Sequence, residues 1–304
     1  MDLHDPREWI FTVSLVALAY TFVGYPILIG LLSRLFPRPI NRQQPAVPPS
    51  VSVVLVAFNE AARIRSRIEN LLSSDYPPQQ LEIIVVTDGS EDDTPLIVGD
   101  YSTRSIRLLK REQRSGKAAC LNAGVPVATG DIVVFCDARQ RFNAATIPAL
   151  VANFSDPQLG AVSGELFIES SSSSVGGGVD LYWKLEKFIR ESESRFSSVI
   201  GATGAVYAIR RALFSPIPED TLLDDVVIPM QIAIQGHRVG FDSAAPAFDP
   251  QTTDPASEKR RKKRTLAGNY QMLFRHPGWL LPWRTGLWWQ VISHKYSRVT
   301  APVF

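Results

Sequence analysis

Four polar residues follow apolar, β-branched runs of the kind that form buried strands. They are Asn59, Glu60, Asp88 and Asp137. Asp137 ends its run directly and is followed by Arg139 and Arg141. A carboxylate with basic neighbours suits a metal-bound polyphosphate, because Mg²⁺ and similar cations prefer hard oxygen ligands and guanidinium groups pair with phosphate oxygens. The residue types therefore predict chemistry at a phosphate-bearing ligand.

Each of these positions also has a purely structural explanation. Asn59 can cap the helix that follows it. Asp88 can form the turn that the run Thr-Asp-Gly-Ser favours, and Asp137 can be an ordinary acid at the end of a strand. A functional site is therefore indicated only by these residues taken together and not by any one of them.

The elements that must position these residues alternate along the chain. Their apolar patterns predict strands over 51–57, 82–87, 106–109 and 132–136, and helices over 60–72, 92–100 and 115–125. Alternating strands and helices form right-handed crossovers and a mostly parallel α/β sheet. Ligands of such sheets bind beyond the carboxyl ends of the strands, where Asp88 and Asp137 are expected to lie.

The most hydrophobic segment is close to the N-terminus. The 25 residues from Trp9 to Ser33 include no charged side chain, and a helix of that length is roughly 37 Å long, enough to cross a ~30 Å hydrocarbon layer. Gly24 and Pro26 are expected to kink it. A cleaved signal peptide and a buried core helix are the alternatives, but the acidic residues before the span do not suit a signal peptide. We predict one transmembrane helix.

Basic residues follow this span, at Arg34, Arg38 and Arg42. The positive-inside rule therefore places the rest of the chain in the cytoplasm, attached to the plasma (inner) membrane and its lipids. The proline-rich stretch 37–50 predicts an extended linker that ends near Ser50.

Composition excludes several other classes of protein. The 304 residues are 45% hydrophobic and 20% charged, which is typical of a folded chain. A formal net charge of +2 argues against nucleic acid as a partner of the whole surface. Cys120 and Cys136 are the only cysteines and lie in apolar runs, so neither a disulfide framework nor a CxxC-type zinc site is available.

Several longer motifs add a resemblance to these patterns. They are VSVVLVAFNE at 51–60, IIVVTDGSEDDT at 83–94, RSGKAACLNAG at 114–124, FCDAR at 135–139 and LLDDVVIPMQIAIQGHRVGF at 222–241. With them, the chain from about Ser50 to about Gln271 resembles the family 2 glycosyltransferases of GT-A fold. The resemblance is greatest to the membrane-bound branch related to cellulose, hyaluronan and poly-N-acetylglucosamine synthases.

The resemblance implies roles for individual residues. It implies nucleotide-sugar binding by Ala57, Asn59, Glu60, Asp88, Lys117, Asp137 and Arg139, with Asp88 at the uridine and Asp137 in the place of the D-x-D metal motif. It makes Asp225 the counterpart of the catalytic base and puts Asp224 in the place of the glutamate beside that base.

The chemistry of sugar transfer fits two acidic sites with different tasks. The diphosphate leaving group needs its charge stabilised, and the acceptor hydroxyl must lose a proton as it attacks. Asp137 would hold Mg²⁺ or Mn²⁺, and Asp225 would accept the proton. An inverting family 2 enzyme needs only one base. The structural alternative is that Asp224 or Asp225 merely caps a helix.

Two departures from the family pattern change these expectations. The metal motif reads Asp137-Ala-Arg139, so its second acid is missing and Arg139 could bind the diphosphate directly. The Q-x-x-R-W motif of processive synthases is replaced by Arg261-Lys-Lys-Arg264-Thr265. We therefore expect transfer of one or a few sugars at least as readily as long-chain polymerisation.

The C-terminal region is basic and then rich in tryptophan. The run 259–264 is interpreted either as a solvated or lipid-facing surface, or as a diphosphate or acceptor contact through Arg261 and Arg264, in preference to nucleic-acid binding. Indoles and basic residues over 279–298 suggest helices in the membrane interface, with a core aromatic cluster as the alternative. The segment 201–211 resembles the border of an acceptor site, and 170–178 is expected to be a flexible loop.

These patterns predict a membrane-anchored, inverting transferase. It would move a sugar from a UDP-sugar to a saccharide or lipid-linked acceptor in cell-envelope or extracellular polysaccharide synthesis. A catalytically silent nucleotide-sugar binding protein and a nucleotidyltransferase are the alternatives. The expected organisation is an anchor at 1–36, a linker at 37–50, a GT-A catalytic domain at 51–250 and an interface or acceptor segment at 251–304.

Overall fold

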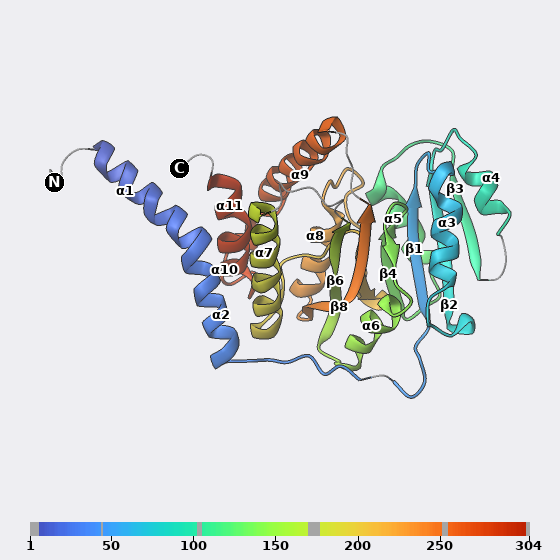
Figure 1. Cartoon of the computed structure of the whole chain (residues 1–304), viewed down its shortest axis with the longest axis horizontal. Coiled ribbons are helices and arrows are strands. Elements are labelled where there is room, and N and C mark those ends of the chain that lie inside the picture. Colours follow the sequence, from blue (N-terminus) through green and yellow to red (C-terminus); the bar gives the residue numbers. More distant parts are fainter. Residues whose placement is uncertain (1–5, 44, 102–104, 170–176, 251–254, 302–304) are drawn as a thin grey trace.

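The structure of the chain is a computed structural model that describes residues 6–43, 45–101, 105–169, 177–250 and 255–301. Its strands lie in one central sheet with helices on both faces (Figure 1). The strands are β1 Val51–Ala57, β2 Leu81–Asp88, β3 Ile106–Arg111, β4 Ile132–Asp137, β5 Arg141–Phe142, β6 Leu159–Glu169, β7 Val206–Arg210 and β8 Arg238–Pro250.

The helices include short 3₁₀ and π segments, which are labelled η. They are α1 Pro6–Ala19, η1 Tyr20–Gly24, α2 Tyr25–Leu35, α3 Ala61–Leu72, η2 Pro78–Gln80, α4 Thr94–Gly99, α5 Lys117–Val127, α6 Thr146–Ala152, η3 Asn153–Ser155, α7 Gly177–Phe196, η4 Arg211–Leu213, α8 Asp224–Ile234, α9 Pro255–Arg275, η5 Pro277–Leu280, α10 Trp288–Gln290, η6 Val291–Tyr296 and α11 Ser297–Thr300. The expected loop at 170–178 lies largely outside the described residues, and the helix after it begins at Gly177.

The sheet has the order β3-β2-β1-β4-β7-β6-β8-β5. β1 pairs in parallel with β2 and β4, and β3 pairs in parallel with β2. This half confirms the predicted parallel sheet. β7 runs antiparallel to both β4 and β6, and β8 is parallel to β6, so β6 and β8 run in the same direction as β4. The expected α/β fold class is confirmed, as a mixed sheet.

Alternate residues of the strands face two separate apolar cores. On one face Val53 and Leu55 pack with Ile64 of α3, and on the other Val54 packs with Leu121 of α5 and Val227 of α8. A sheet that is buried on both faces requires apolar residues at successive positions, which is why β1 and β4 read as continuous hydrophobic runs.

The N-terminal helix is continuous from Arg7 to Leu35 and is the one helix of the described chain that is long and apolar enough to cross a membrane. A signal sequence or a core helix can meet the same two criteria. A π turn, η1, ends at Gly24 and accommodates an extra residue within the helix; the kink expected at Gly24 and Pro26 stays a prediction. The lower part, α2, packs against α7 through the fully buried side chains of Tyr25, Ile29 and Ile189.

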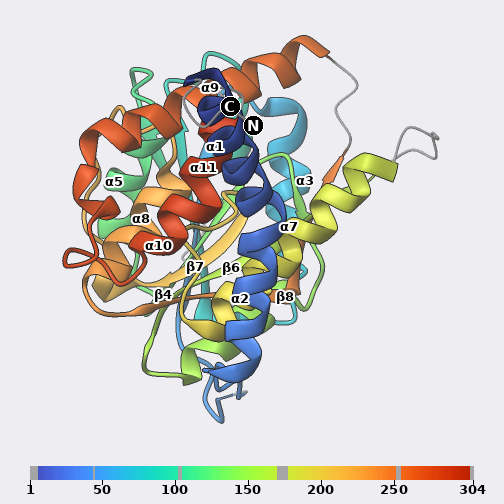
Figure 2. The ribbon, with the colours of Figure 1, turned by 90° about the vertical axis from the view of Figure 1, so that its left-hand side faces the viewer.

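The C-terminal elements lie beside this helix pair. Figures 1 and 2 both show α10 and α11 next to the N-terminal helix and α7. The tryptophans there differ in exposure: Trp279 is buried against His276, whereas Trp283 is 75% exposed. A place for the exposed tryptophans in the membrane interface stays a prediction. Trp289 donates a hydrogen bond from Nε1 to the Tyr20 hydroxyl at 2.9 Å, which ties this segment to the N-terminal helix.

Candidate active site

Four elements converge at one edge of the sheet. β2 ends at Asp88 and β4 ends at Asp137, while α5 begins at Lys117 and α8 begins at Asp224 and Asp225. Because β1, β2 and β4 are parallel, their carboxyl ends lie along the same edge. This is the upper edge in Figure 1, where α9 also lies.

Lys117 joins two of the acids. Its Nζ lies 2.8 Å from Asp137 Oδ1 and 3.5 Å from Asp224 Oδ2. Burial would lower the pKa of this ammonium group, but the charges of Asp137 and Asp224 raise it above its ordinary value. Lys117 is therefore a permanent cation at the centre of the site.

Asp224 and Asp225 belong to the first turn of α8 rather than to its cap. The N-cap residue is Leu223, and no side chain there makes a capping hydrogen bond. The interpretation of either aspartate as a simple N-cap is therefore wrong. Asp225 Oδ2 instead accepts a hydrogen bond from the Gly204 amide at 3.2 Å, and a Cβ on Gly204 would lie only 3.1 Å from that oxygen. The glycine allows the backbone of 201–205 to approach the carboxylate.

The two aspartates have different electrostatic environments. Burial and the neighbouring charge of Asp224 raise the pKa of Asp225 to about 6, while Lys117 and Lys295 act in the opposite direction. A carboxyl group whose pKa is close to neutrality is a better general base than an ordinary aspartate, because it is ionised at pH 7 yet holds a proton more strongly. Asp225 therefore has the properties that a base at this position needs.

Asp88 holds the turn that leads into α5. Its two carboxylate oxygens accept hydrogen bonds from the amides of Ser115, at 2.7 Å, and Gly116, at 2.9 Å. Gly116 has a φ of +92°, a conformation that favours glycine. Because Lys117 follows directly, Asp88 positions the lysine; its predicted contact with uridine stays a prediction.

The loop after β1 is built from Ala57, Asn59 and Glu60. Asn59 has a left-handed φ of 53°, and its Oδ1 accepts a hydrogen bond from the Glu91 amide at 2.9 Å. Ala57 is the buried end of β1, and the Glu60 carboxylate pairs with Arg63 at 3.1 Å. These contacts fix the loop beside the strand ends, where the predicted nucleotide contacts would be made.

Arg139 has an acidic partner that the sequence did not indicate. Its Nη2 pairs with Asp249 Oδ2 of β8, and Gln140 Nε2 donates to the same oxygen at 3.1 Å. Asp249 is almost completely buried, so the pair anchors the segment after β4 to the far part of the sheet. Direct binding of a diphosphate by Arg139 stays a prediction.

The two arginines of α9 have different surroundings. Arg261 pairs with Glu258 one turn earlier at 2.6 Å, as in an ordinary exposed helix pair. Arg264 Nη2 donates to the Leu222 carbonyl at 3.2 Å, which brings it close to the start of α8. Of the two, Arg264 has the better position for a contact with a bound ligand.

Sequence reasoning missed two residues of this site. The Tyr207 hydroxyl is buried without a hydrogen-bond partner in the described chain, and burial and the charge of Asp224 raise its pKa well above the ordinary value. Lys295 of η6 is close enough for its charge to act on Asp225, although burial lowers its pKa. Tyr207 lies in the segment interpreted as bordering the acceptor, but no sequence signal relates Lys295 to Asp225.

A divalent cation at this site would need ligands from the substrate as well as from the protein. Within the described ranges no group of three or more His, Cys, Asp or Glu residues could hold a metal ion. Asp137 nevertheless presents a carboxylate that is 41% exposed at the strand end. Mg²⁺ is usually bound through one or two carboxylates together with substrate phosphates. Asp137 therefore fits a cation that is shared with a diphosphate.

The chain matches the profile of a known family over this fold. Residues 52–217, more than half of the chain, match glycosyl transferase family 2. The chain belongs to this family. The resemblance inferred from the motifs is confirmed at the level of the family.

Curated relatives are polysaccharide synthases. The chain is 24% identical over 231 residues to the poly-beta-1,6-N-acetyl-D-glucosamine synthase of Staphylococcus aureus (strain COL), covering 74% of this chain and 56% of that protein. It is 22% identical to the synthase of the same name from Staphylococcus epidermidis, with the same coverage. The chain thus spans about half the length of the curated relatives that it matches.

Solved structures share the GT-A fold. The mannosyltransferase PcManGT from Pyrobaculum calidifontis, in complex with GDP-Man and Mn²⁺, has a TM-score of 0.71 and 25% identity, covering 86% of this chain and 74% of that one. S. aureus TarS 1-349 in complex with UDP-GlcNAc has a TM-score of 0.55 and 16% identity, covering 74% and 66%. At that identity the TarS likeness concerns the fold.

Proposed function

We propose that the protein is a membrane-anchored, inverting glycosyltransferase. It transfers a sugar from a UDP-sugar to a saccharide or lipid-linked acceptor in cell-envelope or extracellular polysaccharide synthesis. The observation that carries this proposal is the arrangement of Asp225, with its raised pKa, beside the Lys117–Asp137 pair at the ends of the parallel strands.

The proposed roles follow from the charges. Asp225 accepts the proton of the acceptor hydroxyl as that oxygen attacks the anomeric carbon of the donor. Lys117 places a permanent positive charge where the diphosphate leaving group would gain negative charge. Asp224, whose Oδ2 lies 3.5 Å from Lys117 Nζ, holds Lys117 in place, and its charge raises the pKa of Asp225.

Asp137 would hold a divalent cation, Mg²⁺ or Mn²⁺. Such an ion neutralises charge on the diphosphate when it is bound. The Mn²⁺ in the complex of PcManGT supports this assignment, as does the exposed carboxylate of Asp137.

The choice of a UDP-sugar rests on relatives. The curated relatives are named as synthases of an N-acetyl-D-glucosamine polymer, and the TarS structure contains UDP-GlcNAc. PcManGT contains GDP-Man. A GDP-sugar is therefore the donor to test directly against a UDP-sugar.

Membrane anchoring is supported by the N-terminal helix and the residues after it. The helix Arg7–Leu35 has a mean hydropathy of 2.1 in its most apolar window, and only 28% of that window is buried within the protein. Arg34 in the last turn of this helix, and Arg38 and Arg42 after it, are basic, as expected for the cytoplasmic side of a span.

A donor screen tests the function. The full chain is purified in detergent and incubated with UDP-, GDP- and dTDP-sugars, with and without saccharide acceptors, and nucleotide release is measured. We expect release from a UDP-sugar that increases when an acceptor is added. No release from any donor indicates a silent binding protein. Turnover of the sugar nucleotide that needs added pyrophosphate and no saccharide acceptor indicates a nucleotidyltransferase.

A further inference from the structure

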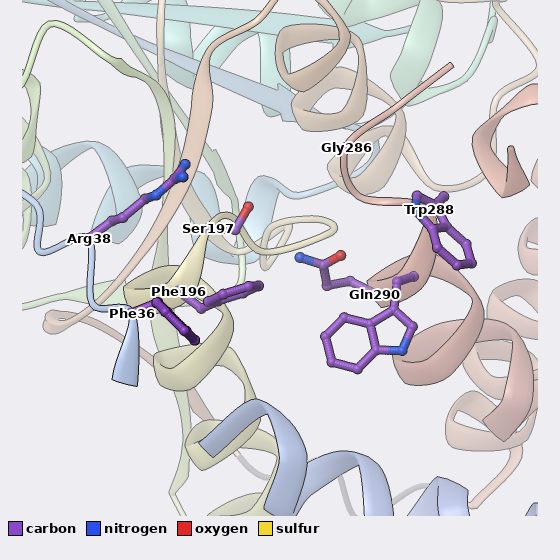
Figure 3. Close-up of a pocket in the computed structure, with 8 residues that line it drawn as sticks. Phe36, Arg38, Phe196, Ser197, Gly286, Trp288 and Gln290 are labelled. Atoms are coloured by element: carbon purple, nitrogen blue, oxygen red, sulfur yellow. The ribbon is translucent and has the colours of Figure 1, made fainter. Parts of the chain in front are cut away.

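A pocket of about 510 Å³ lies between the end of the N-terminal helix and the C-terminal segment (Figure 3). It is far from the catalytic edge of the sheet. Arg238, the first residue of β8, donates hydrogen bonds to the carbonyls of Arg38 and Ser197, which both line the pocket. Since β8 runs in the direction of β4, Arg238 is at the opposite end of the sheet from Asp137.

Gln290 presents an unmatched amide to this pocket. Its side chain is only 2% exposed, and in the described ranges its carboxamide makes no hydrogen bond with another residue. Figure 3 shows the carboxamide pointing from α10 toward Ser197 and Phe196. The amide has donors and an acceptor free on the pocket side, so a polar ligand group in the pocket could hydrogen-bond to it.

The charge of the pocket is positive. Arg38 contributes a guanidinium group that pairs with no carboxylate in the part of the chain that the structure describes, and none of the lining residues is acidic. The Arg238 guanidinium is also close: burial lowers its pKa, the charge of Asp156 raises it, and the charge of Arg38 lowers it. Asp156 therefore acts on Arg238, whereas an anionic ligand would supply a partner for Arg38.

The remaining walls are aromatic and continue into the apolar surface of the N-terminal helix. Phe36, Phe196, Trp288 and Trp289 line the pocket. Leu35 and Phe36, at the end of the candidate span, are 69% and 62% exposed. Aromatic side chains followed by basic ones at the end of a span are typical of the depth of lipid headgroups.

We propose that this pocket binds the headgroup of an anionic glycerophospholipid. The lipid phosphate pairs with Arg38. The Gln290 amide and the Ser197 hydroxyl form hydrogen bonds with the headgroup, and the aromatic walls contact the glycerol and the first methylene groups. The proposal rests on the membrane anchoring proposed above. Because the pocket is at the opposite end of the sheet from Asp225, this lipid is a structural ligand and not the acceptor.

Native mass spectrometry of the full chain in a neutral detergent tests the site. Phosphatidylglycerol and phosphatidylcholine are titrated separately, and the dissociation constant of the first bound lipid is measured. We expect phosphatidylglycerol to bind about tenfold more tightly than phosphatidylcholine, as expected for one charge-assisted hydrogen bond. Arg38→Gln should remove this difference, and Gln290→Leu should weaken the binding of both lipids.

Arg34→Gln is the matched control, because Arg34 is an exposed arginine one turn earlier that does not line this pocket. It should keep the preference for phosphatidylglycerol. Equal binding of the two lipids by the unmodified chain, equal loss in the Arg34 and Arg38 variants, or displacement of the lipid by inorganic phosphate at the lipid's own concentration would each overturn the proposal. Unchanged unfolding temperatures confirm that the variants fold.

Two further measurements separate this proposal from the proposed function. Nucleotide release is assayed on the same samples, and sedimentation with cell membranes reports anchoring. The detergent titration measures lipid binding by the pocket whether or not the helix crosses a membrane. A chain that transfers sugar and sediments with membranes but shows no lipid preference contradicts only the lipid site.

Discussion

Lys117 gives the candidate active site its organisation at the scale of single residues. One ammonium group lies between Asp137 and Asp224, and the remaining acid, Asp225, keeps a raised pKa because it is buried beside the charge of Asp224. Neighbouring carboxylates with different pKa values can perform different tasks. Asp137 is suited to binding a cation, and Asp225 is suited to accepting a proton.

The pH dependence of turnover tests this assignment. Asp225 is active as a base only when ionised, and its pKa is raised to about 6 by burial and by Asp224. We therefore expect kcat/KM to fall tenfold per pH unit below about pH 6, since this parameter reports the free enzyme. A profile that is flat down to pH 5 would be inconsistent with a base of this pKa.

Asp137→Asn tests the metal site. The substitution keeps the size of the side chain but removes the charge that would attract a cation, so we expect turnover to fall about 100-fold or more. EDTA should abolish the activity of the unmodified chain, and Mn²⁺ or Mg²⁺ should restore it.

Asp131→Asn is the control, because Asp131 precedes the other end of β4 and bonds to Ser50. It should leave turnover within about twofold, as is usual for a surface substitution away from a site. Full activity in EDTA, or equal losses in both variants, would argue against a cation at Asp137.

The acids of the site could be predicted from the sequence, whereas their partners could not. Asp137 and Asp225 are marked by a buried strand and by the start of a helix, which are local patterns. Asp249 and Lys295 are placed near Arg139 and Asp225 by tertiary packing across more than 60 residues of chain. No local pattern contains that information, so the sequence did not indicate that Asp249 lies beside Arg139 or that Lys295 lies near Asp225.

At the scale of elements, a buried polar network joins the N-terminal helix, α7 and the C-terminal segment. The Tyr25 hydroxyl donates to Glu193 Oε1 at 2.5 Å, and His294 Nδ1 lies 2.9 Å from the same oxygen. His294 Nε2 lies 3.1 Å from Glu186 Oε2, which also accepts a hydrogen bond from Arg298 Nη1 at 2.6 Å. The next residue, Lys295, is close enough for the charge of Asp225 to act on it, so the network lies next to the candidate active site.

The protonation of His294 makes stability depend on pH. Burial would lower its pKa, but Glu193 and Glu186 raise it to about 9. A histidine with a raised folded pKa stabilises the fold fully below its unfolded pKa of about 6.5, and this contribution disappears as the pH rises through 9. The loss is of the order of 3 kcal/mol.

We therefore expect the unfolding temperature in detergent to fall between pH 6.5 and pH 9.5. His294→Gln should unfold at a lower temperature at pH 6.5 and should lose most of this dependence. His276→Gln should keep the dependence, because the pKa of His276 is lowered by burial and by Arg275. Identical pH dependence in the His294 variant and the unmodified chain would show that His294 is not the titrating group.

The first half of the sheet could be predicted with nearly correct bounds. β1 has the predicted bounds, 51–57, and β4 extends one residue further than predicted, to Asp137. Such continuous apolar runs are characteristic of strands buried on both faces. The antiparallel insertion of β7 between β4 and β6 was not predicted, because strand order depends on long-range pairing rather than on the pattern within a strand.

At the scale of the whole molecule, the proposed orientation places the site on the side of the membrane that holds nucleotide sugars. Both native cysteines are buried, so introduced cysteines can be labelled selectively. With an impermeant maleimide on intact cells, we expect Arg7→Cys to be labelled and Ser73→Cys to be labelled only after lysis. The reverse pattern would place the site outside and would contradict the cytoplasmic assignment.

The central claim is that Asp225 is the base of a sugar transfer, and kcat of Asp225→Asn tests it most directly. Asparagine keeps the shape of the side chain but cannot accept the proton. We expect kcat to fall by about 10² to 10⁴, with donor affinity within about threefold and an unchanged unfolding temperature. Asp224→Asn should lose less, because that residue acts through Lys117. An Asp225→Asn enzyme that folds, binds the donor and turns over at a near-normal rate would contradict the account.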